Sequence, residues 1–292
     1  MINILVTGSN GQLGNELRKL KSDSPDLNFV FTDIAELDIT SPVAIEAIMK
    51  AENISVIINC AAYTAVDKAE NDTEVANRIN AAAPGYLAVA AFKFNALLVH
   101  ISTDYVFSGE GFRPYTENHP CDPRSIYGSS KLKGEFAVIE SGCRYIIIRT
   151  SWLYSAFGNN FIKTVRKYGR ERGHLNMIYD QIGTPTHAAD LAQSILAIVP
   201  QCNDKKSSIY HFSNEGVCSW YDFALEILSQ SGIACSVTPI NTEDYPLPAV
   251  RPFYSVLNKS KIKHDFGIII PHWKDSLTRC LKELELIEST SI

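Results

Sequence analysis

The stretch Ile2-Asn-Ile-Leu-Val-Thr-Gly-Ser-Asn-Gly-Gln-Leu-Gly14 decides the fold of this chain. Its apolar run ends at Thr7 in a glycine-rich turn, and a helical pattern follows through Leu20. Glycine permits positive φ and lets backbone N–H groups approach a pyrophosphate, which then rests on a helix N-terminus. The spacing G-x-x-G-x-x-G departs from the usual G-x-G-x-x-G, and a turn needed only for strand–helix packing would look similar. Its place between a strand and a helix nevertheless favours dinucleotide binding.

Strands and helices continue to alternate beyond this turn. The predicted strands of the first half are Ile2–Thr7, Phe29–Thr32, Val56–Ala62, Leu97–Ser102 and Tyr145–Arg149. An Ala-rich segment from Pro84 to Phe94 predicts a helix that starts at the proline. Nearly continuous apolar strands separated by helices are typical of a parallel sheet covered on both faces. We therefore expect an α/β fold with a doubly wound, Rossmann-type parallel sheet, whose ligands bind at the C-terminal strand ends.

The second half is less regular and predicts a smaller α/β substrate domain. The predicted helices are Ile162–Tyr168, Asp190–Val199, Trp220–Ser231 and Trp273–Leu286, and the predicted strands are Leu175–Ile178, Ile209–Phe212 and Ser236–Pro239. Ser219 and Asp222 have the pattern of a capping box. We expect residues 1–150 to form the dinucleotide-binding domain and residues 151–292 to be mainly the substrate-binding portion. Some segments of the second half should return to the first domain.

Composition limits the classes of partner. The chain has 292 residues and a net charge of −5, which gives no electrostatic case for binding nucleic acid or an anionic membrane. It has no apolar run near the ~20 residues that span a bilayer, and its first residues lack the basic region of a signal peptide. Its seven cysteines are scattered and odd in number, as in a reducing compartment. We expect a cytoplasmic protein.

Asp33 is a candidate for contact with an adenosine ribose. It ends the second predicted strand, 19 positions after Gly14, where an acid can accept hydrogen bonds from ribose hydroxyls. A solvated turn residue would give the same pattern. Between Phe31 and Thr40 the sequence has no Lys or Arg to meet a 2′-phosphate, which mildly favours NADH over NADPH. A basic residue from a distant loop could reverse that preference.

Tyr127-Gly-Ser-Ser-Lys131 places a phenol and an ammonium on one face of a helix. Hydride delivered to a carbonyl leaves an alkoxide that needs a proton, and a lysine charge would lower the pKa of a phenol that supplies it. Ser102-Thr103-Asp104 follows an apolar strand, and its hydroxyls could polarise the carbonyl. An exposed helix pair and a polar turn are the alternatives for each motif alone. In this order they resemble the extended short-chain dehydrogenase/reductase superfamily, whose catalytic triad is Ser/Thr, Tyr and Lys.

Longer motifs resemble the dTDP-4-dehydrorhamnose reductase family within that superfamily. The resemblance covers essentially the whole chain, and it rests on Asn59–Glu70 (N-C-A-A-Y-T-A-V-D-K-A-E), Ser102–Phe107, Tyr127–Glu135, Arg149–Tyr154, Gly158–Phe161, Asp180–Thr186 and Arg251–Pro252. It implies reduction of the 4-keto group of dTDP-4-dehydro-6-deoxy-L-mannose to give dTDP-L-rhamnose, with NADPH or NADH as cofactor. Residues 151–292 would then mainly bind the sugar nucleotide.

The resemblance also implies roles for single residues. Tyr127 would be the proton donor, Lys131 its electrostatic partner and Thr103 the carbonyl-polarising hydroxyl. The implied cofactor contacts are Gly8, Asn10, Gly11, Gln12, Leu13, Gly14, Asp33, Asp38, Ile39, Ala62, Tyr63 and Thr64, together with Tyr127 and Lys131. The implied substrate contacts are Thr103, Asp104, Tyr105, Trp152 and Arg251. A core aromatic is the alternative for Trp152, and a surface charge beside a proline loop is the alternative for Arg251.

Several alternatives stay open at this point. Some family members hold a divalent metal at a dimer interface, but Glu16 has no convincing companion acid around His187–Ala189. Mg²⁺ is therefore not supported, and the protein could be a monomer or a homodimer. A sugar-nucleotide 4,6-dehydratase would carry Glu where this chain has Tyr105. A reductase or epimerase acting on another sugar nucleotide is a further possibility. So is a non-catalytic regulatory subunit resembling the methionine adenosyltransferase β subunit.

Overall fold

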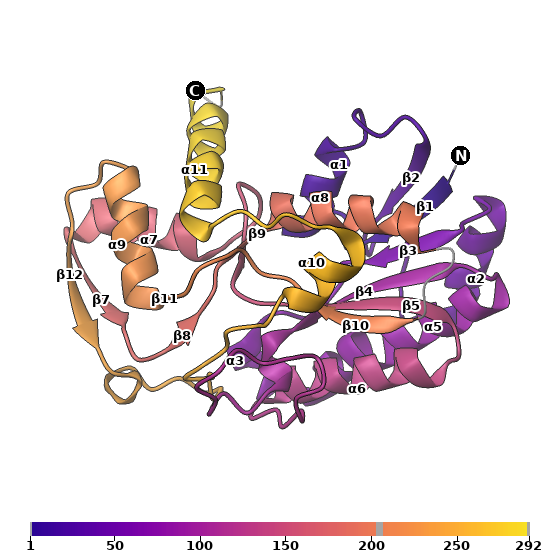
Figure 1. The fold of residues 1–292 in the computed structure, drawn as a ribbon, viewed down its shortest axis with the longest axis horizontal. Helices are drawn as coiled ribbons and strands as arrows, with labels where there is room; N and C mark the ends of the chain where they lie inside the picture. Colours follow the sequence, from indigo (N-terminus) through magenta and orange to yellow (C-terminus); the bar gives the residue numbers. More distant parts are fainter. Residues whose placement is uncertain (1, 203–206, 291–292) are drawn as a thin grey trace.

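A six-stranded parallel sheet forms the larger of two lobes in the computed structural model, which describes residues 2–202 and 207–290 (Figure 1). The strand order is β10 (Ser208–His211), β5 (Arg144–Thr150), β4 (Leu97–Thr103), β3 (Val56–Asn59), β1 (Ile2–Thr7), β2 (Leu27–Thr32). Strands β2 and β3 lie on opposite sides of β1, so the order reverses between β1 and β3. Such a reversal opens a crevice at the C-terminal strand ends.

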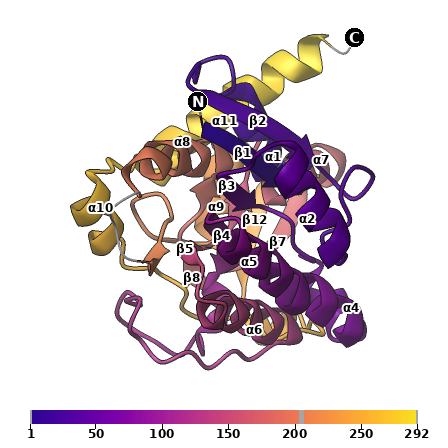
Figure 2. The same cartoon turned by 90° about the vertical axis from the view of Figure 1, so that its right-hand side faces the viewer.

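Helices cover both faces of this sheet (Figure 2). The first face packs against α1 (Gln12–Lys19), α8 (Ala188–Ile198) and α10 (Ser260–Phe266), and the second against α2 (Pro42–Ala51), α5 (Ala83–Lys93) and α6 (Ile126–Glu140). Side chains of a strand alternate between the faces, so Ile4 and Val6 enter the first core while Leu5 enters the second. Because both faces are buried, the strands are almost wholly apolar. The predicted doubly wound fold is confirmed.

Two predicted boundaries were wrong. Strand β3 ends at Asn59 rather than Ala62, because the Asn59 side chain turns the backbone by accepting a hydrogen bond from the Ala61 N–H at 3.2 Å. The helical segment that contains Pro84 starts at Thr73, since α4 (Thr73–Asn77) and the π-helix η1 (Arg78–Ala82) run directly into α5, where Pro84 lies in the first turn. A π-turn widens the helix and marks functional sites in many proteins. Here it brings Arg78 to the crevice described below.

The smaller lobe has a core of its own. It comprises α7 (Phe161–Arg172), α9 (Trp220–Gln230), α11 (Trp273–Thr290) and the paired strands β6 (Leu153–Tyr154) with β9 (Thr186–His187), β7 (His174–Ile178) with β12 (Ser236–Ile240), and β8 (Ile182–Gly183) with β11 (Cys218–Ser219). Ile162, Phe223 and Leu277 pack together in that core. The predicted capping box of Ser219 and Asp222 is present at the start of α9. The remaining short elements are α3 (Val66–Ala69), η2 (Asp104–Val106), η3 (Val199–Gln201) and η4 (Thr242–Asp244).

The second half of the chain also contributes to the larger lobe. Strand β10 pairs with β5 as an edge strand, and α8 packs against α1. Within residues 2–202 and 207–290, the helices are all too short or too polar to cross a membrane.

Candidate active site

A cleft of two joined cavities lies at the C-terminal ends of the parallel strands. The first has a volume of about 560 Å³ and the second about 500 Å³. Both are lined by Gly8, Gly11, Cys60 and Ala62, so they meet at the glycine turn. The position agrees with the crevice expected from the strand order. An elongated ligand can therefore lie across the turn with one end in each cavity.

The glycine turn provides a bare backbone surface at the centre of this cleft. Gly8 has φ +65°, and a Cβ there would stand 2.7 Å from the Ala61 Cα. A Cβ on Gly14 would stand 2.5 Å from the Ser9 Cα, because α1 starts so close to β1. Gly11 precedes α1 and carries no side chain to cap it. The first amides of α1 thus face the cleft beside a backbone that a pyrophosphate can approach, which fits a dinucleotide.

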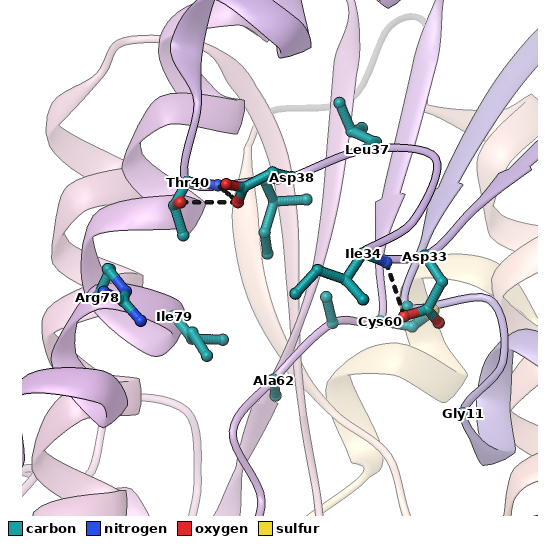
Figure 3. A pocket seen from close by; sticks show the side chains of 13 residues that line it. Gly11, Asp33, Ile34, Leu37, Asp38, Thr40, Cys60, Ala62, Arg78 and Ile79 are labelled. Atoms are coloured by element: carbon teal, nitrogen blue, oxygen red, sulfur yellow. Dashed lines mark hydrogen bonds between the residues drawn. The ribbon is translucent and has the colours of Figure 1, made fainter. Parts of the chain in front are cut away.

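The first cavity holds the predicted adenosine contacts (Figure 3). Asp33 follows β2, and its carboxylate accepts hydrogen bonds from the N–H groups of Asn10 and Ile34, both at 2.9 Å. Asp38 accepts from the hydroxyl and the N–H of Thr40 at 2.7 and 2.8 Å. These bonds, helped by the Arg78 charge, hold the pKa of Asp38 below its usual range. Hydrogen bonds from backbone N–H groups therefore hold the side chains of Asp33 and Asp38 in place at this end of the cleft.

Arg78 is a charged residue of the first cavity that sequence reasoning missed. It enters from η1, and Figure 3 shows it well apart from Asp33, across the cavity. Residues 32–39, at the end of β2 and just after it, contain no cation to meet a 2′-phosphate, whereas Arg78 is distant in sequence. A π-turn before Pro84 gave no recognisable signal. The first cavity therefore contains a guanidinium from a distant segment, which is the alternative that the sequence left open.

The second cavity collects the predicted catalytic residues. Thr103 ends β4, while Tyr127 and Lys131 project from the first turns of α6. Helix α6 begins here because the Ser125 hydroxyl accepts a hydrogen bond from the Gly128 N–H at 3.1 Å. A Cβ on residue 128 would stand 2.2 Å from the Tyr105 carbonyl oxygen, so only glycine allows this approach. Because Gly128 allows this close approach, the phenol of Tyr127 lies beside the end of β4.

Burial shifts the pKa values of Tyr127 and Lys131 in opposite directions. Lys131 is 1% exposed, and its ammonium donates to the Ile101 carbonyl at 2.6 Å. Burial lowers the pKa of Lys131 to about 8, against the opposing charge of Glu135. Burial raises the pKa of Tyr127 to about 12, and a hydrogen bond with Thr103 acts in the opposite direction. The expectation that Lys131 lowers the pKa of this phenol was wrong, because burial outweighs other effects and the ammonium is bound to a carbonyl.

The predicted substrate contacts in this cavity combine a carboxyl group with aromatic rings. Asp104 is buried, and its burial raises its pKa to about 7. Tyr105 meets the Tyr127 ring edge-on, with centroids 5.4 Å apart. Trp152 lines the cavity rather than lying wholly within the core. A carboxyl group beside aromatic rings can bind the hydroxyls and the carbon faces of a sugar.

The remaining predicted residues divide into two groups. Gln12, Leu13, Ile39 and Thr64 line the cleft, whereas Asn10, Gly14, Tyr63 and Arg251 do not. The Arg251 guanidinium instead donates two hydrogen bonds, of 2.6 and 2.9 Å, to the Asp67 carboxylate. Lining residues that were not assigned a role include Ile34, Ile79, Thr150, Ser151 and Asn160. Asn160 lay within a quoted motif, Gly158–Phe161, and that motif was the signal that could have identified it.

Glu16 lies near charged groups of α1 and α8. Its carboxylate is buried and bonded to Lys19 at 3.0 Å, and the charge of Asp190 acts on it. Asp190, the acid just beyond His187–Ala189, already binds Arg279, Ser276 and Asn214. The described part of the chain shows no cluster of three or more His, Cys, Asp or Glu side chains that could hold a metal ion.

Comparisons with known proteins agree with the geometry of the cleft. The family model described as the RmlD substrate binding domain matches residues 2–286. A dTDP-4-dehydrorhamnose reductase of Aggregatibacter actinomycetemcomitans is 39% identical, over 95% of this chain and 97% of the relative. The crystal structure of such a reductase from Clostridium acetobutylicum superposes with a TM-score of 0.93 at 44% identity, over 97% of this chain and 100% of that one. One from Bacillus anthracis, solved in complex with NADP, has a TM-score of 0.92 at 38% identity with the same coverage. The chain belongs to the family that the RmlD substrate binding domain model describes, and it is similar to these reductases over nearly their whole length.

Proposed function

We propose that this chain is a dTDP-4-dehydrorhamnose reductase, which uses NADPH or NADH to convert dTDP-4-dehydro-6-deoxy-L-mannose to dTDP-L-rhamnose. The observation that carries the proposal is the meeting of Thr103, Tyr127 and Lys131 in one cavity that joins the glycine turn. The relatives of high identity named for this activity support the substrate class. We place the protein in the cytoplasm, as a monomer or homodimer, with a sugar nucleotide as its partner and without nucleic acid or membrane.

The chemistry divides between the bound cofactor and the protein. A reduced nicotinamide cofactor held at the glycine turn would supply the hydride for C4 of the sugar. Thr103 and Tyr127 direct their hydroxyls to the carbonyl oxygen, and the Tyr127 phenol gives its proton to that oxygen as negative charge develops. A pKa of about 12 keeps the phenol protonated at neutral pH, ready to donate. The Lys131 ammonium, below its pKa of about 8, offsets the phenolate charge that results.

Cofactor choice rests on two opposed groups in the first cavity. Asp33 favours NADH, because a carboxylate binds ribose hydroxyls and repels a 2′-phosphate. Arg78 favours NADPH, because a guanidinium pairs with phosphate. We infer that the chain accepts both cofactors with a mild preference for NADH. Titrations of Asp33→Ala and Arg78→Ala test this, since the first should weaken NADH binding more and the second NADPH binding more. Equal losses of both cofactors in both variants would contradict it.

Substrate binding is assigned to the second cavity and the adjoining smaller lobe. Asp104, Tyr105 and Trp152 would contact the sugar, and residues 151–292 would supply most of the nucleotide site. Arg251 would contact the diphosphate by exchanging its Asp67 partner for phosphate oxygens. That ion pair is partly exposed, so it can open at little cost. The elements between 188 and 211 that pack on the larger lobe belong with the cofactor domain.

Tyr127→Phe tests the proposal directly. Purified protein receives NADH or NADPH and dTDP-4-dehydrorhamnose generated in situ, and the loss of reduced-nicotinamide absorbance is followed. The variant should lose at least ~100-fold in kcat, the lower end for general acid catalysis, while its cofactor affinity stays nearly intact. Tyr86→Phe is the matched control, because Tyr86 is exposed on α5 away from the cleft. Unchanged turnover in Tyr127→Phe would refute the assigned role.

Turnover by the native chain separates the alternatives. Oxidation that requires both enzyme and sugar supports the reductase. If folded protein binds cofactor yet oxidises neither NADH nor NADPH, with or without Mg²⁺, a reductase or epimerase for another sugar nucleotide or a regulatory subunit becomes the better reading. Recovery of a synthetase in a pull-down would favour the regulatory subunit. Tyr105 replaces the Glu that a 4,6-dehydratase would need, so elimination is not expected.

A further inference from the structure

Trp152 holds an unusual backbone conformation at the wall of the second cavity. It lies between β5 and β6 and has φ +48°, in the left-handed region that bulky residues rarely adopt. Such strain persists only where the surroundings fix the residue, and it is concentrated at functional sites. Its carbonyl accepts a hydrogen bond from the Thr186 N–H at 3.1 Å, which ties the backbone to β9. The orientation of the indole must be fixed by other contacts.

One of these contacts is a stacked tryptophan. The rings of Trp152 and Trp220 are nearly parallel, at 9°, and their centroids are 3.6 Å apart. Trp220 is the first residue of α9, and the capping box of Ser219 and Asp222 fixes the start of that helix. Phe161 packs against Trp220, with centroids 4.6 Å apart. The capping box and Phe161 therefore hold the Trp220 ring in place, so that it presents a rigid face to Trp152.

The other contact is the bare backbone of Gly183. A Cβ on this residue would stand 2.6 Å from Cε2 of Trp152 and 2.7 Å from the Ser255 hydroxyl. Strand β8 pairs antiparallel with β11, so Gly183 lies opposite Cys218, two residues before Trp220. One short pair of strands thus places both the ring that stacks on Trp152 and the surface on which its edge rests. Any side chain at 183 would displace the indole.

We propose that Trp220 and Gly183 are positioning residues that hold the Trp152 indole as a fixed wall of the sugar site. Neither residue lines the cavity, so both act through Trp152. They set the space left for the sugar ring and thereby its recognition, whereas neither residue faces the glycine turn, where the cofactor would bind, or the nucleotide of the substrate. This inference rests on the proposed function, because it takes the second cavity as the sugar site.

Binding of two related ligands tests the proposal without catalysis. dTDP-L-rhamnose and dTDP differ by the sugar, so the ratio of their calorimetric Kd values isolates sugar recognition. In Trp220→Ala this ratio should shift about tenfold against the rhamnoside, near the upper end for an aromatic pair, while dTDP and NADPH affinities change less than about twofold. Gly183→Ala should shift the ratio in the same direction. Trp220→Phe keeps a stacking face and should restore most of the affinity.

A structural readout accompanies the binding data. The chain has three tryptophans, and only the stacked pair should give a strong exciton couplet in circular dichroism. Trp273→Phe, the matched control from the core of the same lobe, should keep both the couplet and the ratio of Kd values. Trp220→Ala should lose both. A folded Trp220→Ala with an unchanged ratio, or with equal losses of dTDP and dTDP-L-rhamnose, would overturn the inference. Native protein that binds neither dTDP ligand would instead overturn the proposed function.

Discussion

Glu135 provides a stringent test of how the catalytic helix is held. It lies one helical turn after Lys131 and is 1% exposed. The Arg149 guanidinium donates to its two oxygens at 2.6 and 2.9 Å, and the Ser102 hydroxyl donates to one of them. Arg149 belongs to β5 and Ser102 to β4. The carboxylate therefore joins α6 to the two strands whose ends frame the second cavity.

Glu135→Gln should destabilise the protein severely. The amide removes the charge that compensates the buried guanidinium, and loss of one partner of a buried ion pair costs about 3–5 kcal/mol. Total stabilities are only about 5–15 kcal/mol, so this is a large fraction. For a chain of this size the cost corresponds to a fall of roughly 10 °C in Tm. Thermal melts and urea unfolding, both followed by circular dichroism, measure the change.

The chain offers a matched control for this substitution. Glu46 pairs with Lys93 at 2.6 Å, but the two side chains are 40% and 56% exposed. Glu46→Gln should therefore change stability by no more than about 0.5 kcal/mol. A double variant, Glu135→Met with Arg149→Met, should be more stable than the sum of the two single changes predicts. The buried pair does not hold α6 as argued if Glu135→Gln and Glu46→Gln have the same Tm. The same conclusion follows if the stability change of the double variant equals the sum of the two single changes.

The remaining predictions concern charge and backbone. Burial raises the pKa of Asp104 from 3.8 to about 7, so the folded state retains a proton that the unfolded state has lost, and stability falls as pH rises through that window. Relative to Asp104→Asn, this loss should reach up to about 4 kcal/mol, and parallel profiles in urea titrations at several pH values would contradict it. Gly8→Ala should abolish cofactor binding in a fluorescence titration, because it adds a clash with the backbone to the strain of a positive φ. Gly173→Ala is the control: Gly173 also has a positive φ, but a Cβ there meets open space, so cofactor binding should be unchanged. With the pKa of Lys131 lowered to about 8, the ammonium is lost above that pH, so kcat should fall there; a rate that stays flat from pH 7 to 10 would show that the charge is not used.

Much of the fold followed from the sequence because its signals are local. Strands such as Ile2–Thr7 are apolar at every position except Asn3 and Thr7, since both faces of the sheet are covered. The glycine turn fixed the start of α1, and Ser219 with Asp222 fixed the start of α9. Because the predicted strands are parallel, their C-terminal ends must lie at the same edge of the sheet. The composition of the second cavity, with Thr103 and the α6 pair, could be predicted for that reason.

What could not be predicted depends on contacts between distant segments. Arg78 reaches the first cavity through a π-turn whose Asn80 amide bonds to Tyr63 and Ser130, and local propensity does not specify such a turn. The pairing of Arg251 with Asp67 joins residues far apart in sequence. The stacking of Trp152 on Trp220 likewise joins residues that are far apart in sequence. In each case tertiary packing decides the partner, and no spacing in the chain encodes it.

The protonation of Tyr127 shows why the fold is part of the chemistry. A tyrosine and a lysine four residues apart suggest that the ammonium lowers the pKa of the phenol. In the folded chain burial acts on both groups in opposite directions, because it disfavours phenolate and ammonium alike. At neutral pH the phenol therefore holds its proton before reaction, beside a lysine that still carries its positive charge. Negative charge on the substrate oxygen is what shifts that balance, so the proton is released when the alkoxide forms and is held until then.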